Sequence, residues 1–234
     1  MIKKPLLLLA LLFVCSIMNA QDLVSPSYGF SHSKTAYITL ADGTEISGNI
    51  KDIDRDEGLI EFIKLQDAAG KKHKLKPEDI KFMYLPPSGL DKLGKMNDFL
   101  SDTQKWNDAK LNQDFLHQGY AYFETTDVQI KKKTSKLLMQ LINPGFSKNF
   151  RIYCDPYAIE TASLGVGGMK FVGGDAKSFY VAKKDQPAFL LKKKEYKKIY
   201  ATLWNDCEKL SSVTTEPKWG DFVKNVVTYS GCAE

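Results

Sequence analysis

The sequence has few of the residues that build compact metal and nucleophile sites, with three histidines and four cysteines among 234 residues. The histidines are His32, His73 and His117, and none has a cysteine or glutamate partner at the spacing of a zinc site. Gly165–Gly168 is no phosphate loop, because no strand directly precedes it and no Lys-Ser or Lys-Thr pair follows. We therefore expect neither a local zinc site nor a phosphate-binding loop.

An excess of one charge is also missing. Lysine and arginine number 33 against 28 acidic residues, a net charge of +5, and without Lys3 and Lys4 the balance is 31 to 28, or +3. This balance argues against nucleic-acid binding. The basic runs Lys131–Lys133 and Lys192–Lys194 each lie beside an amphipathic segment. They are typical of solvated faces, and phosphate or lipid contact is the alternative for them.

Long apolar runs are scarce as well. The longest, Leu6–Val14, is shorter than the roughly 20 residues that span a bilayer, so we expect no transmembrane segment in the mature chain. Residues 1–20 instead have the layout of a secretory signal peptide, with a basic start, an apolar core and Ala20 at the cleavage position. Cys15 follows Val14, where bacterial lipidation needs a small residue. The predicted location is the periplasm, the outer membrane or the cell exterior.

What is present begins with a segment rich in β signals. Residues 21–34 are polar and turn-rich, which predicts a flexible lead-in. Residues 35–85 then hold five short apolar stretches separated by turn signals, among them Asp42-Gly43 and the segment 54–58. Five short strands joined by tight turns predict a small barrel-like β unit. Residues 86–116 read as a helical or irregular connector.

Residues 117–234 predict an antiparallel sheet followed by two helices. The expected strands lie at Tyr120–Phe123, Leu137–Ile142, Phe150–Cys154 and Ser178–Ala182. Apolar residues then recur with helical period at Tyr196, Ile199, Tyr200, Leu203 and Cys207, and again at Trp219, Phe222, Val223, Val226 and Val227. Because apolar stripes need a partner, the helices should pack on this sheet. The predicted fold class is α+β.

The positions of the cysteines relative to these helices suggest a disulfide. Each predicted helix ends near a cysteine, Cys207 or Cys232, and export permits disulfides. A bond between them closes a loop of about 25 residues and should stabilise the fold by roughly 3 kcal/mol. Cys154 is then left unpaired.

The blocks YITLADGTEISGNI, KLKPEDIKFMYL and FLLKKKEYKKIYATLWNDCEKL, with a cysteine near the C-terminus, resemble a group of uncharacterised exported proteins from Bacteroidota-type bacteria. The shared features are turn residues, core apolar residues and a cysteine pair. The resemblance implies an exported protein with a disulfide, and it carries no catalytic signature.

The clearest metal candidate is a calcium turn formed by Asp52, Asp54 and Asp56. An EF-hand is excluded, because that loop needs glycine and glutamate where this chain has Glu57 and Ile63. A polar hairpin turn is the favoured reading of the segment. Calcium is the one cofactor that the sequence suggests.

Nucleophilic candidates are weaker. Cys154 with His117 as base and Asp155 as its orienting partner is one arrangement, but a buried structural thiol is the commoner fate of such a cysteine. A redox role would require an exposed Cys154. Carboxylate pairs such as Glu57 with Glu61 or Glu160 are available, yet any acidic-rich chain offers them.

Aromatic residues along the middle sheet suggest a binding surface, and the candidates are Tyr120, Tyr122, Tyr153 and Tyr157. Without a catalytic motif, the sequence favours a non-enzymatic exported envelope or surface module that binds a protein or glycan. The alternative is an exported hydrolase whose site is assembled from distant residues. A deep pocket holding carboxylates would favour the hydrolase, and an exposed aromatic patch would favour the binding module.

Overall fold

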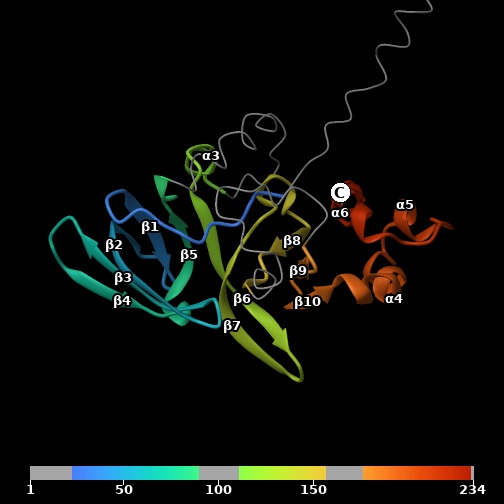
Figure 1. The fold of residues 1–234 in the computed structure, drawn as a ribbon, viewed down its shortest axis with the longest axis horizontal. Coiled ribbons are helices and arrows are strands. Elements are labelled where there is room, and N and C mark those ends of the chain that lie inside the picture. Colours follow the sequence, from blue (N-terminus) through green and yellow to red (C-terminus); the bar gives the residue numbers. More distant parts are fainter. Residues whose placement is uncertain (1–22, 90–110, 157–175, 233–234) are drawn as a thin grey trace, which may run out of the picture.

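The computed structural model describes residues 23–89, 111–156 and 176–232. Within these ranges ten strands form one mixed sheet in the order β4-β3-β2-β1-β5-β6-β10-β9-β8, with β7 paired to β6. Helices near the C-terminus cover one part of this sheet (Figure 1). The mainly β architecture with C-terminal helices agrees with the predicted α+β class. None of the helices in the described ranges has the length and apolar character needed to cross a membrane.

The first half of the sheet is antiparallel throughout. Its strands are β1 (Thr35–Leu40), β2 (Glu45–Asp56), β3 (Leu59–Asp67), β4 (Lys72–Leu75) and β5 (Ile80–Leu85), with the 3-10 turn η1 (Pro77–Asp79) before β5. β1 pairs with both β2 and β5, and β3 pairs with β2 and β4. The five strands expected in residues 35–85 are therefore present, and their closure into a barrel stays a prediction.

Tight turns join these strands where the sequence indicated them. At the end of β2, Glu57 and Gly58 both have positive φ angles, 46° and 82°. Two such residues make the two-residue turn whose twist matches an antiparallel hairpin. Gly43, between β1 and β2, has φ 88°.

The lead-in segment differs from the expectation of flexibility. The backbone N–H of Val24 donates to the carbonyl of Ile142 at 2.7 Å, and Phe30 bridges Pro87 and is buried. Residues 23–34 therefore run as an extended strap across both halves of the molecule, because their apolar side chains find partners there.

The second half contains β6 (Ala121–Ile130), β7 (Lys133–Gln140), β8 (Phe150–Tyr153), β9 (Ser178–Lys183) and β10 (Ala188–Lys192). The predicted second sheet is neither separate nor wholly antiparallel. β6 pairs with β5 through Ala121–Glu124, and β10 pairs parallel to β6 at Ala188 and Phe189. The sequence pattern missed β10 because that strand leads directly into a helix.

The pairings of this half close a ring. β6 pairs with β7, β8 with β9, and β9 with β10, which returns to β6. The chain beyond β7 completes the circuit, since Leu141 bridges Tyr153 and the N–H of Ile142 donates to the carbonyl of Ile152 at 2.9 Å. Side chains gathered in one buried cluster from these strands include Tyr122, Val128, Met139, Leu141, Tyr153, Tyr180, Ala182 and Ala188.

Helices cover the outside of β8–β10. They are α4 (Lys193–Leu203), α5 (Glu208–Ser211) and α6 (Phe222–Ser230), with the 3-10 turn η4 (Trp219–Asp221) leading into α6. Figure 1 shows them on the side away from β1–β5. Their core contacts join Phe150, Ile152, Val181 and Leu191 of the sheet to Tyr196, Trp204, Phe222, Val226 and Tyr229. The predicted packing of two main helices on these strands is thus observed.

The helix ends differ from the expectation. α4 stops at Leu203, and Cys207 lies beyond it as the N-cap of α5. The predicted disulfide is confirmed all the same, because Cys207 and Cys232 are bonded with their Cα atoms 5.4 Å apart. Two shorter elements lie elsewhere, α3 (Gln113–His117) before β6 and η2 (Pro144–Phe146) before β8.

Candidate functional site

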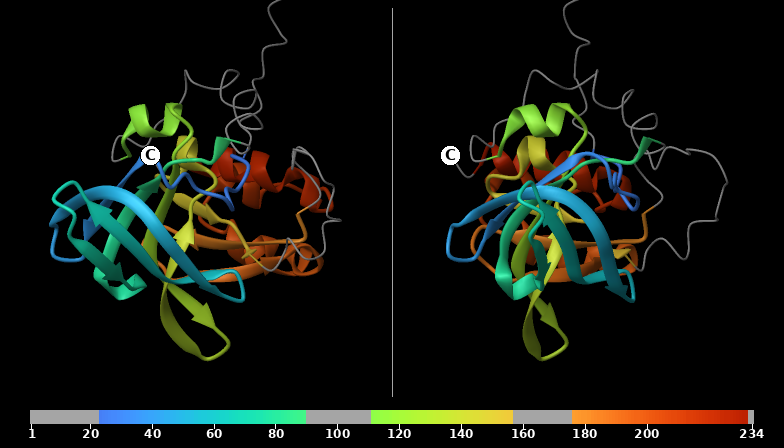
Figure 2. Two further views of the ribbon diagram at one scale, coloured as in Figure 1. Left: turned by 60° about the vertical axis from the view of Figure 1, so that its left-hand side comes forward. Right: turned by 90° about the vertical axis from the view of Figure 1, so that its left-hand side faces the viewer.

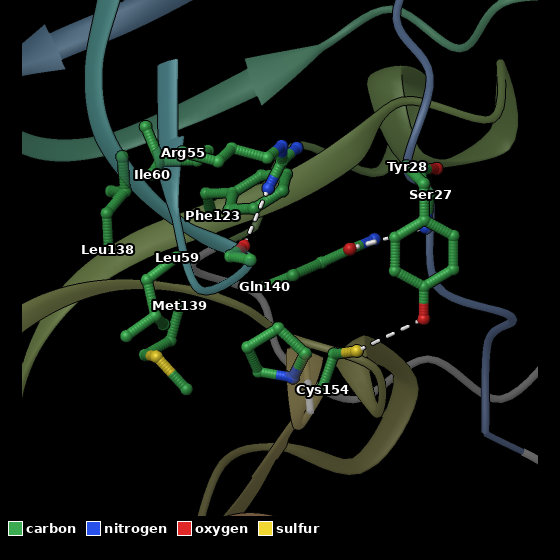
Figure 3. Close-up of a pocket in the computed structure, with 12 residues that line it drawn as sticks. Ser27, Tyr28, Arg55, Leu59, Ile60, Phe123, Leu138, Met139, Gln140 and Cys154 are labelled. Atoms are coloured by element: carbon green, nitrogen blue, oxygen red, sulfur yellow. Dashed lines mark hydrogen bonds between the residues drawn. The ribbon is translucent and has the colours of Figure 1, made fainter. Parts of the chain in front are cut away.

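A small cavity lies where the two halves meet. The turn at Gly58 approaches the loop after β8 so closely that a Cβ on Gly58 would lie 2.7 Å from the Cβ of Pro156. Beside this contact is a cavity of about 30 Å³. Its lining comes from the strap, from the β2–β3 hairpin, from β6 and β7 and from the loop after β8 (Figure 3). The polar residues in it are Ser27, Arg55, Gln140, Cys154 and Tyr28.

Arg55 supplies the charge of this cavity. Its Nη1 donates to the carbonyl oxygen of Gly58 at 3.0 Å, and the guanidinium carbon lies 5.9 Å from the centre of the Phe30 ring. Its Nη2 atom is buried and donates to none of the residues that the structure describes. Burial lowers the pKa of Arg55, but a guanidinium keeps its charge in proteins.

Cys154 and Tyr28 face each other across the cavity, with Sγ and the hydroxyl oxygen 3.5 Å apart (Figure 3). Burial, followed by the neighbouring Cys154, raises the pKa of Tyr28, so its hydroxyl stays protonated at neutral pH. Cys154 is only 8% exposed, so the favoured prediction of a buried thiol is confirmed, and the redox alternative, which required an exposed thiol, is removed. Cys154 directly follows β8 and belongs to the buried cluster between the sheet and the helices.

Among the described residues that line the cavity there is no histidine and no carboxylate. Asp155, the proposed orienting residue of a cysteine nucleophile, is buried and accepts a hydrogen bond from Ser178 Oγ at 2.5 Å. His117 is the last residue of α3 and does not line the cavity.

A second polar cluster lies inside the ring. Arg151 Nη1 donates to both carboxylate oxygens of Glu124, and the hydroxyl of Tyr153 donates to Glu124 Oε1 at 2.7 Å. The hydroxyl of Tyr122 lies 3.4 Å from Glu124 Oε2. The side chain of Glu124 is 14% exposed and that of Arg151 is 24% exposed, so the ion pair is largely removed from water.

Electrostatics in this cluster favours the paired state. Burial alone would lower the pKa of Arg151, but the charge and hydrogen bonds of Glu124 outweigh it and raise the pKa. Burial, reinforced by the Glu124 charge, raises the pKa of Tyr153. Because Glu124 accepts hydrogen bonds from three neighbours, we regard the cluster as a structural ion-pair network that joins strands across the ring rather than as a reactive site.

The predicted calcium turn is a strand. Asp52, Asp54 and Asp56 belong to β2, and Asp52 pairs with Lys64 at 2.9 Å. Asp54 Oδ1 accepts the backbone N–H of Arg55 at 3.0 Å. Within the described ranges no group of three or more histidine, cysteine, aspartate or glutamate residues lies close enough to hold a metal ion. An extended strand spaces alternate carboxylates along its length.

The predicted tyrosine surface is only partly at the surface. Tyr122 and Tyr153 are 6% and 1% exposed and direct their hydroxyls at Glu124, so they are core residues. Tyr120 is half-buried, packs beside Tyr37 and Phe115, and donates to the carbonyl of Thr35 at 3.1 Å. The alternation of the strands turns Tyr122 and Tyr153 into the ring. Tyr157, Glu160, Gly165–Gly168 and residues 1–20 lie outside the described residues.

The basic run Lys131–Lys133 is at the tip of the β6–β7 hairpin, which projects from the body of the molecule (Figure 2). All three lysines are exposed, as is the neighbouring Ile130 at 40%. We call residues Gln129–Lys136 the arm. The other run, Lys192–Lys194, is exposed at the junction of β10 and α4.

Sequence reasoning missed Arg55, Glu124 and Arg151, although one signal for two of them was present. The chain has 33 basic residues, and only Arg55 and Arg151 are arginines. Arginine is favoured over lysine for buried ion pairs and planar hydrogen bonding. In a chain that otherwise uses lysine, both exceptions lie at partly buried sites, as Lys183 also does beside Asp206.

Comparison of the chain with protein-family models, curated protein sequences and solved structures gives no significant match.

Proposed function

We propose that this protein is an exported, non-enzymatic module that binds an acidic protein or glycan partner through its arm. The observation that carries the proposal is the projection of a basic hairpin tip from a compact body (Figures 1 and 2). Residues 129–136 contain four lysines and no acidic residue. An exposed isoleucine beside them adds apolar contact area to the charge.

The arm holds its shape without a partner. β7 pairs with β6 along its whole length, from Phe123–Gln140 to Ile130–Lys133. Gln129 Nε2 donates to the carbonyl of Lys131 at 2.9 Å, and Thr134 Oγ1 donates to Gln129 Oε1 at 3.2 Å. A binding element that is already ordered loses less conformational entropy when it binds.

The charge of the arm selects the class of partner. Asp127, outside the arm, is 3.3 Å from Lys136, which leaves Lys131, Lys132 and Lys133 in water at the tip. A concentrated positive field accelerates association with an acidic surface and favours it over a neutral one. Binding should therefore weaken as the ionic strength rises.

Export is part of the proposal. The signal-like residues 1–20, together with the Cys207–Cys232 bond, support it, because disulfides persist in oxidising compartments. N-terminal sequencing of the protein from its native host should find Gln21 as the first residue. A chain that keeps Met1 and stays in the cytosolic fraction would contradict export.

Partner binding is tested by mild crosslinking in intact cells, affinity purification and mass spectrometry. The triple variant Lys131→Glu, Lys132→Glu, Lys133→Glu should recover about tenfold less partner, a loss of about 1.4 kcal/mol. The matched control is Lys192→Glu, Lys193→Glu, Lys194→Glu, which makes the same change of charge in the other basic run. The proposal fails if both variants recover the wild-type amount of partner, or both lose it equally.

A glycan partner escapes protein mass spectrometry, so the same three proteins are also applied to an array of acidic and neutral glycans. Retention of acidic glycans by the wild type and the control alone would assign the partner to that class. No binding to proteins or glycans in either assay would reject the arm as a binding element.

A further inference from the structure

Arg55 is a partly buried cation with no anionic partner among the described residues. Its Nη1 is occupied by the carbonyl of Gly58, while Nη2 lies buried at the cavity without an acceptor. The other arginine, Arg151, shows the usual solution, since its guanidinium is neutralised by Glu124. The two arginines of the chain therefore differ in what balances their charge.

An arrangement of this kind is costly when the cavity is empty. A buried donor without an acceptor loses its hydration, and a buried charge without a counter-charge loses more. Unpartnered buried groups in native proteins usually mark an ion, a water or a functional site. Arg55 Nη2 therefore points to a ligand that accepts a hydrogen bond.

Neutral hydrogen-bonding groups complete the cavity. The hydroxyl of Tyr28 lines it and stays protonated, and its proton is available to a ligand when the Cys154 thiol donates in the contact between the two side chains. Gln140 Oε1 accepts the N–H of Ser27 at 3.3 Å, which leaves its amide group as a donor. The described lining residues provide one cation, several donors and no carboxylate, so the cavity is suited to an anion.

The size of the cavity restricts the anion. A site for one water needs about 10–15 Å³ measured in the same way, and this cavity offers about 30 Å³. Two oxygen-sized groups therefore fit, which matches the two oxygens of a carboxylate. Guanidinium and carboxylate are also complementary in geometry and charge.

We propose that this cavity is a binding site for a single carboxylate group, held by Arg55 Nη2 with Tyr28 and Gln140 as neutral donors. The site is separate from the arm and goes beyond the proposed function. Its carboxylate belongs either to a free small acid or to an acidic peptide that enters beside Tyr28, which is 42% exposed.

The test is a titration of the mature protein with ¹³C-labelled formate at constant ionic strength, adjusted with sodium chloride. The formate line should broaden in proportion to the bound fraction, and the midpoint of thermal unfolding should rise with formate concentration. Unchanged line width and midpoint would overturn the proposal and leave water as the occupant. An equal rise with chloride would overturn the assignment to a carboxylate.

Variants connect the signal to this cavity. Arg55→Met should weaken formate binding by about tenfold or more. Arg55→Gln, which keeps a neutral donor and guards against a folding defect in the first variant, should weaken it as well. Lys51→Met is the matched control, because it removes an exposed cation from the same strand. Wild-type affinity in both Arg55 variants, or equal loss in Lys51→Met, would reject the site.

A second titration, with N-acetyl-aspartate amide, distinguishes the two sources of the carboxylate. Competition between this compound and formate in the wild type would assign the site to acidic peptides. Binding of formate alone would assign it to free small acids. Failure of the arm variants in the partner assay would leave both results unaffected, so the two proposals stand or fall separately.

Discussion

At the scale of single residues, both arginines of the molecule enter partly buried sites. Lysines form surface pairs such as Lys64 with Asp52 and Lys136 with Asp127, although one lysine, Lys183, is also partly buried where it pairs with Asp206. A guanidinium keeps its charge on burial and presents a planar set of donors. Arg151 uses them on Glu124 inside the ring, and Arg55 keeps one directed at the cavity.

Breaking the Glu124–Arg151 pair should destabilise the fold strongly. Arg151→Met leaves the Glu124 carboxylate in the ring without its counter-charge, and we expect a loss of about 3–5 kcal/mol in the free energy of unfolding by urea. The double variant Glu124→Leu, Arg151→Met should recover most of that loss. As a control, Lys136→Met removes an exposed pair and should cost at most about 1 kcal/mol. A loss below that of the control in Arg151→Met would show that the ring does not depend on the ion pair.

The lowered pKa of Asp206 predicts part of the loss of folding stability at low pH. Partial burial would raise its pKa, but hydrogen bonds from Lys183, Tyr229 and Lys184 outweigh burial and lower the pKa from 3.8 to about 2. Between these two pKa values the unfolded chain binds more protons than the folded one, so the stability contributed by Asp206 is present at higher pH and is lost as the pH falls.

The corresponding variant is Asp206→Asn. Its free energy of unfolding should be lower than that of the wild type at neutral pH, and it should fall less between about pH 5 and pH 2. Asp185→Asn, in an exposed turn, removes the same charge and should keep the wild-type pH profile. Parallel profiles for Asp206→Asn and the wild type in urea titrations would contradict the assignment.

At the scale of elements, the β2–β3 hairpin connects the two halves. Its turn has a positive φ at Gly58 and contacts Pro156 after β8, and the neighbouring Arg55 lines the cavity. The turn residues were recognisable in the sequence. Their contact with Pro156 was not, because the two segments are about a hundred residues apart and nothing local records that they meet.

Gly58→Ala tests this contact. The alanine Cβ meets both an unfavourable φ and the Pro156 ring, so we expect a loss of more than about 1 kcal/mol in unfolding free energy. Gly43→Ala is the matched control: its φ is 88°, and no heavy atom lies within 4 Å of the added Cβ. Gly43→Ala should lose only the free energy of unfolding that alanine costs at a positive φ, about 1 kcal/mol. Equal losses in both variants would show that Pro156 moves away from the added methyl group without a cost in free energy.

At the scale of the whole molecule, a helical layer covers the outer face of β8–β10, and a single covalent bond closes that layer. Cys207 precedes α5 and Cys232 follows α6, so the disulfide joins the segment between α4 and α5 to the end of α6. Trp204, Phe222 and Tyr229 beneath it are fully buried. The cover therefore depends on both burial and the cross-link.

Loss of the bond should reduce the stability of the whole domain. The double variant Cys207→Ala, Cys232→Ala should lose roughly 3 kcal/mol in unfolding free energy, since the bond closes a loop of 25 residues. Dithiothreitol should lower the stability of the wild type to that of the variant and leave the variant unchanged. A wild type insensitive to reduction would contradict a stabilising role.

The sequence by itself determined the local features of this protein: the signal-like start, the hairpin turns, the strand segments of residues 35–85, the two apolar helix stripes and the cysteine pair. These depend on residue type and on periodicity over a few positions. Tertiary structure alone decided that β6 joins both halves, that β10 pairs parallel to it, and that Tyr122 and Tyr153 point into a closed ring. It also brought Arg55 from β2 beside Cys154. Pairing between distant strands depends on which faces become buried together, and that choice is made by the packing of the whole chain.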